Sequence, residues 1–466
     1  MNTLARPTTV TLLRVLLVAA MVRVLYALGA WLVTRDPSVF HGPDSESYLA
    51  PARELLSRGA FTLGGDPELK RTPGYPLLLL PGLWLGHPNL TVAALQIALS
   101  TATVWGVYAV ASRALDDSRA AVTAAALYAL EPLSVRYAAA VSSETLHTAM
   151  VVGALVLALG YLRDGRFAQI LAATTLLAAA AYVRPAGYYL PFGLLLLLAL
   201  LAMIARAWKR LPHVALSALA AGAVLLPWQL RNRALGFDGF SAITALNMYF
   251  YNGAAIRAAK EGKSYYEMQA AMGFNDDEAY LRIHPEQRTW RPGERFEHMR
   301  AEGARLVREN LPLYTRLHVA GMVRVLLDPA AIDLLKPYRL YPEQGGLLDR
   351  IVTHGVWDGL LYLFRTRPFA ASWLIGLGIV LGVVYLLALR GLLVQRHFLE
   401  PSVILLVACI AYFVVIAGGP VAVSRFRHPA MPMLCVLAAA GIHAPWRRIR
   451  RTAAIRGSSG ARPIGA

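Results

Sequence analysis

The feature that most constrains this chain is the recurrence of long apolar segments separated by short charged connections. Of its 466 residues, 57% are hydrophobic and 16% are charged, a composition typical of a polytopic membrane protein and unlike that of a soluble one. A helix that crosses a bilayer needs about 20 mainly apolar residues. The sequence predicts an all-α membrane protein with about ten such helices, at roughly 10–33, 90–112, 119–141, 145–162, 167–183, 187–206, 213–230, 371–393, 402–418 and 429–445.

The distribution of charge indicates how the chain is oriented in the membrane. The formal net charge is +18 at pH 7, but region 231–370 holds 19 Lys/Arg and 16 Asp/Glu and is nearly balanced. Most of the excess lies in short connections on one side of the apolar segments and in the tail 447–466. Because Lys and Arg accumulate on the cytoplasmic side, we expect a multi-pass protein of the plasma (inner) membrane with cytoplasmic N- and C-termini. The basic tail is interpreted as facing anionic lipid and not nucleic acid.

The predicted helices divide the chain into four parts. Residues 1–230 form an N-terminal transmembrane module, whose first extracytoplasmic loop is 35–89. Residues 231–370 are predicted to form an extracytoplasmic cap, because stretches such as FEHMRAEGARLVREN have helical periodicity. Residues 371–446 return to the membrane, and 447–466 form the cytoplasmic tail.

Two shorter helices are predicted within the first loop. Apolar and charged residues of 45–57 alternate at helical spacing, which is typical of a helix lying along the membrane interface. The run 73–86, PGYPLLLLPGLWLG, is too short and too rich in Pro and Gly to span, and it is predicted to be a half-inserted helix packed on protein. Within the third apolar segment, Glu131 and Pro132 predict a kink or an early end.

Two carboxylates, Asp44 and Glu46, lie at the start of the predicted helix 45–57. Asp44 is a candidate N-cap, since short polar side chains accept the free amides of a first turn. Capping explains neither Glu46 nor the basic residues Lys70 and Arg71 later in the loop. A carboxylate can accept the proton of an acceptor hydroxyl, and a guanidinium can bind two oxygens of a phosphate leaving group. Both interpretations of Asp44 remain open at this point.

Further basic residues are predicted on the same face as the first loop. Such loops are usually poor in Lys and Arg, so the cluster of Arg425, Arg427 and His428 favours a function in binding phosphate. Arg184 and Arg231 lie at helix ends, where they are candidates either for phosphate binding or for anchoring the helix at the interface.

Several charges fall within or beside apolar segments, where an isolated charge is unfavourable. Glu144 either balances a neighbouring arginine or contributes to a divalent-cation site. Glu131 and Arg136 are predicted to pair with each other, and Arg23 is expected to face protein or water.

A set of short motifs, in order along nearly the whole chain, resembles one superfamily. Asp44-x-x-x-Tyr48, followed by an amphipathic helix and Arg71-x-Pro73-x-Tyr75-Pro76, is similar to the opening of GT-C superfamily glycosyltransferases. The branches that it most resembles are family 39, the ArnT-like enzymes and the dolichyl-phosphate-mannose-protein mannosyltransferases. SSETL at 142–146, LPWQLRN at 226–232 and SRFRHPAMPMLCVLAAAG at 424–441 resemble later parts of the same pattern.

The resemblance implies a GT-C fold and transfer of a sugar, with inversion, from a polyprenyl-phosphate donor to an acceptor hydroxyl on the extracytoplasmic face. Asp44 then corresponds to the general base, and the polyprenyl chain is expected in a groove near 73–86. The candidate donor-phosphate ligands are Arg71, Arg184, Arg231, Arg425, Arg427 and His428. Glu46 and Glu144 are candidate second carboxylates, although Asp-x-Glu replaces the two adjacent acids of some branches. A divalent cation is a candidate cofactor, as in some relatives.

A transporter or flippase of lipid-linked sugars would share the basic face and the apolar groove. Transporters commonly contain internal repeats and place charges near the bilayer midplane, whereas this sequence shows no repeat and gathers its charges at one face. A non-catalytic scaffold leaves Asp44 and Arg71 unexplained. The sequence therefore favours the enzyme, and it leaves open the sugar and whether the acceptor is a glycolipid, a polysaccharide or a protein.

Overall fold

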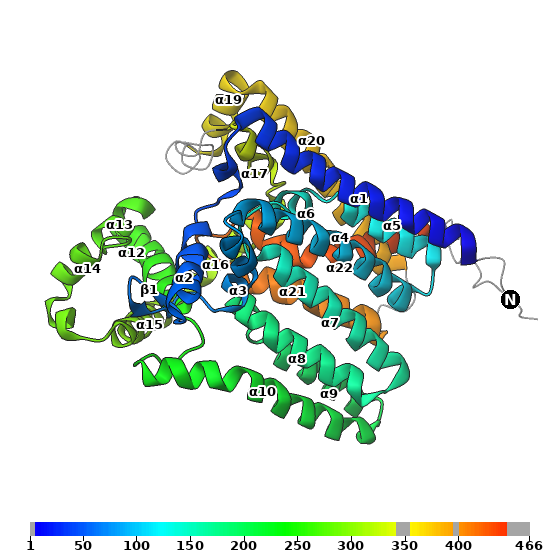
Figure 1. The fold of residues 1–466 in the computed structure, drawn as a ribbon, viewed down its shortest axis with the longest axis horizontal. Coiled ribbons are helices and arrows are strands. Elements are labelled where there is room, and N and C mark those ends of the chain that lie inside the picture. Colours follow the sequence, from blue (N-terminus) through cyan, green and yellow to red (C-terminus); the bar gives the residue numbers. More distant parts are fainter. Residues whose placement is uncertain (1–4, 342–354, 395–399, 445–466) are drawn as a thin grey trace, which may run out of the picture.

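The computed structural model describes residues 5–341, 355–394 and 400–444, and the predicted tail at 447–466 lies outside the described residues. The described chain is almost entirely helical (Figure 1), and its one sheet is a hairpin of two short strands, β1 (Thr62–Leu63) and β2 (Asp66–Pro67). The predicted all-α fold is confirmed.

A bundle of apolar helices forms the body of the molecule. Each of the ten predicted segments is helical: α1 (Ala5–Thr34), α4 (Pro88–Leu115), α5 (Ser118–Ala129), α7 (Glu144–Asp164), α8 (Phe167–Val183), α9 (Leu190–Ile204), α10 (Leu211–Ala234), α20 (Pro368–Val394), α21 (Pro401–Ile416) and α22 (Met431–His443). Six spans in the described part of the chain are long and apolar enough to cross a membrane, so the fold is that of a polytopic membrane protein. The helices α5, α8, α21 and α22 are shorter than these six, with 12 to 17 residues each.

The third apolar segment breaks where Glu131 and Pro132 predict a break. α5 ends at Ala129, and a short helix, α6 (Pro132–Tyr137), begins with the proline at its first position. The Glu131 carboxylate accepts a hydrogen bond from the backbone N–H of Ser134 (2.6 Å) and so caps α6. The predicted pairing of Glu131 with Arg136 is wrong, because the Arg136 guanidinium instead donates to the Asp333 carbonyl (3.0 Å).

A buried arginine stabilises this break. Arg23 of α1 is fully buried, and its guanidinium donates to the carbonyl of Ala129 (2.9 Å) and to the hydroxyls of Ser100 (2.7 Å) and Ser134 (2.8 Å). A carbonyl at a helix end lacks its partner in the next turn and needs another donor where water is excluded. Arg23 faces protein, as expected, and supplies that donor.

The first loop forms the two predicted short helices, α2 (Ser45–Arg58) and α3 (Gly74–Trp84). α3 packs against α2, α4 and α8. Gly74 permits the contact with α8, because a Cβ at this position would lie 2.7 Å from the backbone of Tyr182. The start of α3 is therefore fixed against the end of α8, and Arg71 lies just before it.

Region 231–370 contributes further helices, some of which pack on the first loop. They are α11 (Ile243–Leu246), a π-helix (Asn247–Gly253), α12 (Ala254–Glu261), α13 (Tyr265–Ala271), α14 (Asp277–Ile283), α15 (Pro292–Glu309), α16 (Leu311–Leu327), α17 (Ala331–Leu335) and α19 (Val356–Thr366). A separate apolar core joins this region to the loop, with Leu69 among the buried side chains of Phe237, Tyr249 and Phe250.

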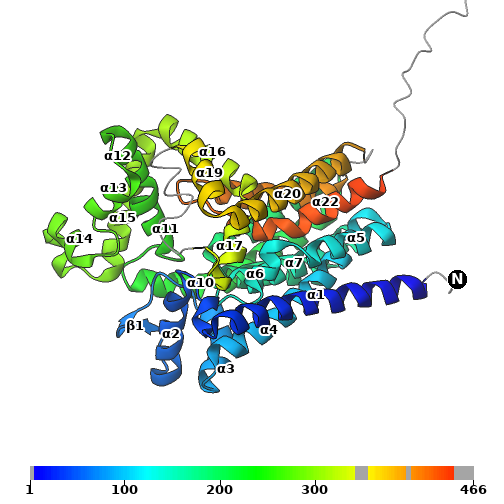
Figure 2. The same ribbon diagram turned by 90° about the horizontal axis from the view of Figure 1, so that it is seen from above.

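The two ends of the bundle differ in what they carry. Figure 2 shows α2 and α11 to α15 gathered at one end, whereas the start of α1 and the end of α22 lie at the other. The N-terminal and C-terminal helix ends therefore lie on the same side of the bundle, opposite the first loop. Which side faces the cytoplasm remains a prediction from the charge distribution.

Candidate functional site

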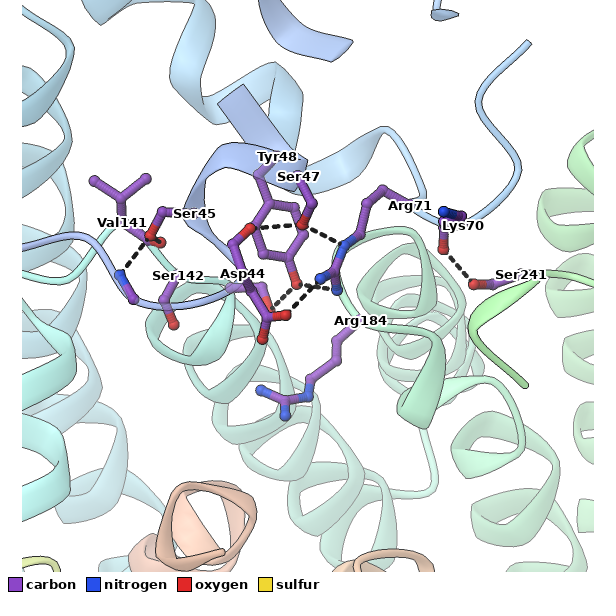
Figure 3. A network of polar contacts seen from close by, with 12 residues as sticks. Asp44, Ser45, Ser47, Tyr48, Lys70, Arg71, Val141, Ser142, Arg184 and Ser241 are labelled. Atoms are coloured by element: carbon purple, nitrogen blue, oxygen red, sulfur yellow. Dashed lines mark hydrogen bonds and ion pairs between the residues drawn. The ribbon is translucent and has the colours of Figure 1, made fainter. Parts of the chain in front are cut away.

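Asp44 immediately precedes α2, and its side chain makes no capping hydrogen bond to that helix. Its two carboxylate oxygens instead meet two arginines. Oδ1 lies 2.7 Å from Nη2 of Arg71, and Oδ2 lies 2.7 Å from Nη1 of Arg425. The capping interpretation of Asp44 is therefore wrong, because the geometry directs its carboxylate away from the helix amides (Figure 3).

Arg71 is held in place by the face of α2 that follows Asp44. Its Nε donates to the Ser47 hydroxyl (2.9 Å), its Nη1 donates to the Tyr48 hydroxyl (3.1 Å), and its guanidinium lies 4.3 Å from the centre of the Tyr48 ring. Residues three and four positions apart on a helix share a face, so Asp44, Ser47 and Tyr48 all point toward Arg71 (Figure 3). The Glu68 carboxylate accepts the backbone N–H of Arg71 (2.9 Å) and fixes the main chain there.

Arg425 comes from a distant part of the chain, the 3-10 helix Ser424–Ala430 between α21 and α22. Ser424 anchors this turn, since its hydroxyl donates to the Asp333 carboxylate (2.9 Å). The Arg425 guanidinium lies over the Phe426 ring (5.1 Å) and reaches Asp44 from the side opposite Arg71. Two loops separated by most of the sequence thus supply one cation each to the same carboxylate.

A second ion pair adjoins this one. Glu144, in the first turn of α7, is buried, and its Oε1 lies 2.5 Å from Nη1 of Arg184 at the end of α8. Arg184 also lies 5.4 Å from the centre of the Phe426 ring, on which Arg425 packs as well. Glu144 therefore balances a neighbouring arginine, one of the two roles predicted for it.

We call the five residues Asp44, Arg71, Glu144, Arg184 and Arg425 the charged cluster. Its three arginines face two carboxylates, so one positive charge is uncompensated. Burial alone would raise the pKa of Asp44, but Arg425 and Arg71 outweigh burial and hold that pKa below its usual value. Burial would lower the pKa of Arg425, but Asp44 and Glu144 raise it above its usual value. Asp44 and Arg425 therefore remain ionised at neutral pH, and the cluster, with its excess of one positive charge, is suited to an additional anion.

Three of the predicted phosphate ligands lie outside the cluster. Arg231 donates to the carbonyls of Glu68 (2.8 Å) and Phe61 (3.3 Å), which ties α10 to the hairpin of the first loop. Arg427 is buried and donates to backbone carbonyls preceding α17. His428 is buried beside the ring of Tyr128. Each of these side chains is engaged by the protein itself.

Glu46 also lies apart from Asp44. Its carboxylate is two-thirds exposed and pairs with Arg53 on the opposite face of α2. Two residues along a helix correspond to a rotation of roughly 200°, so the side chain leaves the face that carries Asp44. The structure does not bring the predicted second carboxylate Glu46 to the site.

The described residues contain no group of three or more His, Cys, Asp or Glu side chains arranged to hold a metal ion. The carboxylates of Asp44 and Glu144 are each paired with arginine. A divalent cation stays a prediction from the resemblance.

An apolar cavity lies inside the bundle. Side chains of α7, α8, α9 and α21 line it, among them Val151, Leu177, Leu194 and Cys409. Tyr412, which also lines it, donates to the carbonyl of Ala186 (2.5 Å), just beyond Arg184. No residue of the charged cluster lines the cavity: its first lining residue on α7 is Val151, roughly two helical turns beyond Glu144. α3 does not line it either, unlike the groove predicted near 73–86.

The sequence analysis assigned no role to Ser47 or Phe426. Ser47 could have been found from its spacing, because it lies three residues after Asp44 on a predicted helix. Phe426 separates two predicted phosphate ligands in sequence, but its position between Arg184 and Arg425 depends on tertiary structure.

Comparison with known proteins identifies the fold. The family profile described as dolichyl-phosphate-mannose-protein mannosyltransferase matches residues 70–230. The oligosaccharyltransferase AglB of Archaeoglobus fulgidus, solved with an inhibitory peptide and a dolichol-phosphate, aligns with 14% identity and a TM-score of 0.51, covering 92% of this chain and 50% of that one. The same organism's enzyme tethered to an acceptor peptide aligns with 15% identity and a TM-score of 0.50, covering 92% and 49%.

A further similar structure is ArnT from Cupriavidus metallidurans bound to undecaprenyl phosphate, with 19% identity, a TM-score of 0.37, and coverage of 90% of this chain and 76% of that one. No protein of curated function matches the chain in sequence. The chain spans about half the length of the oligosaccharyltransferases that it matches. It has the fold of GT-C superfamily glycosyltransferases, as the motifs predict.

Proposed function

We propose that the protein is an integral membrane glycosyltransferase that moves a sugar from a polyprenyl-phosphate donor to an acceptor hydroxyl. The observation that carries this proposal is the Asp44 carboxylate held between Arg71 and Arg425, with Arg184 adjacent. The GT-C fold and the match to mannosyltransferases support the same class of reaction. The positive-inside distribution of charge favours the extracytoplasmic face of the plasma membrane for this site.

The donor combines a phosphate with an isoprenoid chain, and the site offers a partner for each. The uncompensated charge of the arginines attracts the phosphate, and guanidinium groups bind its oxygens in pairs. The cavity lined by α7, α8, α9 and α21 is apolar and suits part of the chain, deeper in the bundle than Arg184. During transfer the bond from the anomeric carbon to the phosphate oxygen breaks, and fixed positive charge stabilises the leaving phosphate.

Asp44 is the general base of the proposed reaction. The acceptor oxygen forms a bond to the anomeric carbon on the face opposite the phosphate, with inversion, while its proton passes to the Asp44 carboxylate. A carboxylate between two arginines is a weak base, because both cations favour its ionised form. When phosphate takes over part of the bonding to Arg71 and Arg425, the pKa of Asp44 rises and the carboxylate becomes better suited to accept a proton.

Transfer in detergent solution tests this proposal. The purified protein is supplied with a radiolabelled polyprenyl-phosphate sugar and with glycolipid, polysaccharide and peptide acceptors. We expect label in the acceptor, and Asp44→Asn is expected to lower the rate by about 10²- to 10⁴-fold with unchanged yield of folded protein. Glu46→Gln is the matched control, since that carboxylate is exposed and faces away.

The transporter alternative gives a different result in the same experiment. A transporter moves label only across a sealed membrane and leaves the polyprenyl-phosphate sugar intact, whereas an enzyme transfers sugar without a compartment. Full activity of Asp44→Asn would show that Asp44 takes no part in the chemistry. Movement of label in sealed vesicles, without transfer in detergent, would rule out the enzyme.

A further inference from the structure

α11, the π-helix Asn247–Gly253 and α12 follow one another without a break and form one helix. This helix lies against both loops that supply arginines to Asp44. Before α11, the Ser241 hydroxyl donates to the Lys70 carbonyl (2.6 Å), beside Arg71. Further along the same helix, Oδ1 of Asn252 lies 3.4 Å from the position that a Cβ on Gly419 would occupy. Gly419 belongs to the connection that leads to Arg425. The helix therefore crosses from one arginine loop to the other.

The part of this helix nearest the Arg425 loop is a π-helix, Asn247–Gly253. Such segments are rare and occur frequently at functional sites. One side of it is fixed on α15, where a Cβ on Gly303 would lie 2.4 Å from the backbone of Met248. Tyr249 and Phe250 are buried in the core beneath it. α15 and the core therefore hold the backbone of the π-helix in place, and Tyr251 and Asn252 lie on its remaining side.

These two side chains are half-buried and carry unengaged polar groups. Among the described residues, neither the Tyr251 hydroxyl nor the Asn252 amide makes a hydrogen bond. The Tyr251 ring packs edge-on against Phe274 (5.4 Å between ring centres), which stands on a loop fixed by the left-handed glycine Gly273. Burial raises the pKa of the Tyr251 hydroxyl, and the charges of Asp44, Arg71 and Arg425 also influence that pKa.

We propose that Tyr251, Asn252 and Phe274 form the acceptor subsite and that they bind the sugar ring of a carbohydrate acceptor. This inference rests on the proposed function, because it assigns the hydroxyl that Asp44 deprotonates to a glycan. A pyranose has a face of C–H groups and an edge of hydroxyls. A tyrosine provides an apolar ring with a polar tip, and the adjacent amide can both donate to and accept from hydroxyl groups.

A peptide acceptor is less well matched to this surface. Extended peptides are commonly bound by main-chain hydrogen bonds at a sheet edge. In the described part of the chain the only sheet is the hairpin β1–β2, with two residues in each strand. The two aromatic rings and the free amide instead offer side-chain contacts to a compact, hydroxyl-rich ring.

Saturation-transfer NMR on the full-length protein in detergent tests the subsite without turnover. The probes are methyl glycosides of glucose, mannose and N-acetylglucosamine, and a short Ser/Thr peptide. We expect saturation of glycoside ring protons in the wild type and its loss, by about fivefold or more, in Tyr251→Ala. Tyr251→Phe keeps the ring and is expected to retain most of the signal. Tyr266→Ala is the control, since Tyr266 is exposed in the same region and its ring contacts Tyr265.

Binding of polyprenyl phosphate to the same variants separates acceptor from donor effects. We expect Tyr251→Ala to bind polyprenyl phosphate as the wild type does. Equal glycoside signals in wild type and Tyr251→Ala, a signal for the peptide alone, or loss of polyprenyl-phosphate binding in Tyr251→Ala would each overturn the subsite. Tyr251-dependent glycoside binding by a wild type that transfers no sugar would support the subsite and refute the proposed transfer reaction.

Discussion

Arg425 and Arg427 belong to the same 3-10 turn but have contrasting environments. Arg427 is 2% exposed, and its Nη1 donates to the carbonyls of Val325 (2.5 Å) and Asp328 (2.8 Å). Arg425 has a side chain that is 28% exposed, and its charged partner is Asp44. One arginine is thus engaged by the main chain, whereas the other is held by a carboxylate.

The same difference in bonding partner distinguishes the other buried or half-buried arginines described above. Backbone carbonyls are fixed and neutral, so an arginine bound by several of them stabilises a fold and has no reason to change partner. A carboxylate can be replaced by another anion of similar charge and geometry. Arg23 and Arg231 are of the first kind, and Arg71 and Arg184 are of the second.

Arg425→Ala addresses the exchangeable arginine. We expect transfer to fall by about 10²- to 10³-fold, because the variant lacks one of the cations that stabilise the leaving phosphate. The protein should still fold, since the lost side chain is partly exposed. Initial rates at saturating donor measure the effect, and Arg425→Lys should recover only part of it because a lysine cannot bind two oxygens in a planar fork. A rate within about threefold of wild type for the alanine variant would contradict this role.

Arg427→Ala addresses the structural arginine two residues away. Its removal leaves carbonyls of the segment before α17 without a donor in a buried site. Each such group destabilises by about 1–3 kcal/mol, so we expect a lower thermal unfolding midpoint and a lower yield of monodisperse protein. The rate per folded molecule should change little. A stable variant with strongly reduced transfer would indicate that Arg427 binds the donor. It would contradict the difference in role between Arg425 and Arg427.

Much of the fold follows from the sequence because its determinants are local. Apolar length predicts the helices, helical periodicity predicts α2, and the Glu131–Pro132 pair predicts the break after α5. The start of α22 was less predictable, because a buried 3-10 turn, Ser424–Ala430, precedes it in place of a further turn of α-helix. The sequence showed apolar character there, but not where the helical hydrogen bonding begins.

The candidate site was predicted in part, and the errors have one cause. The sequence indicated that Asp44 and Arg71 belong together, and the structure places Arg184 and Arg425 beside them. It could not separate Arg425 from Arg427, because both stand in the same basic run and differ only in what tertiary structure places next to them. The charge of an arginine can be read from the sequence, whereas the groups around it depend on tertiary structure.

Asp44→Asn should affect donor binding in a direction opposite to its effect on transfer. In the free protein the Asp44 carboxylate occupies guanidinium groups of Arg71 and Arg425. Removing its charge frees both for phosphate, so we expect polyprenyl phosphate to bind more tightly, by about tenfold, or about 1.4 kcal/mol. Equilibrium binding of labelled polyprenyl phosphate measures this change, with Glu46→Gln as the control. Unchanged or weaker binding would show that the carboxylate and the phosphate do not share these arginines.

The smallest expected effect is the dependence of stability on pH. Because Arg425 and Arg71 hold the pKa of Asp44 below its usual value, the unfolded chain binds this proton at a higher pH than the folded protein does. The stabilisation by these ion pairs is therefore complete above a pH of about 4, the usual pKa of the carboxyl group, and is lost as pH falls through the lower pKa of the folded state. The difference in unfolding midpoint between wild type and Asp44→Asn isolates this carboxylate, since the other titrating groups are common to both proteins. We expect the difference to be constant at neutral pH and to shrink in acid. A difference that grows as pH falls would mean that Asp44 carries a raised pKa and that its arginine partners do not dominate its surroundings.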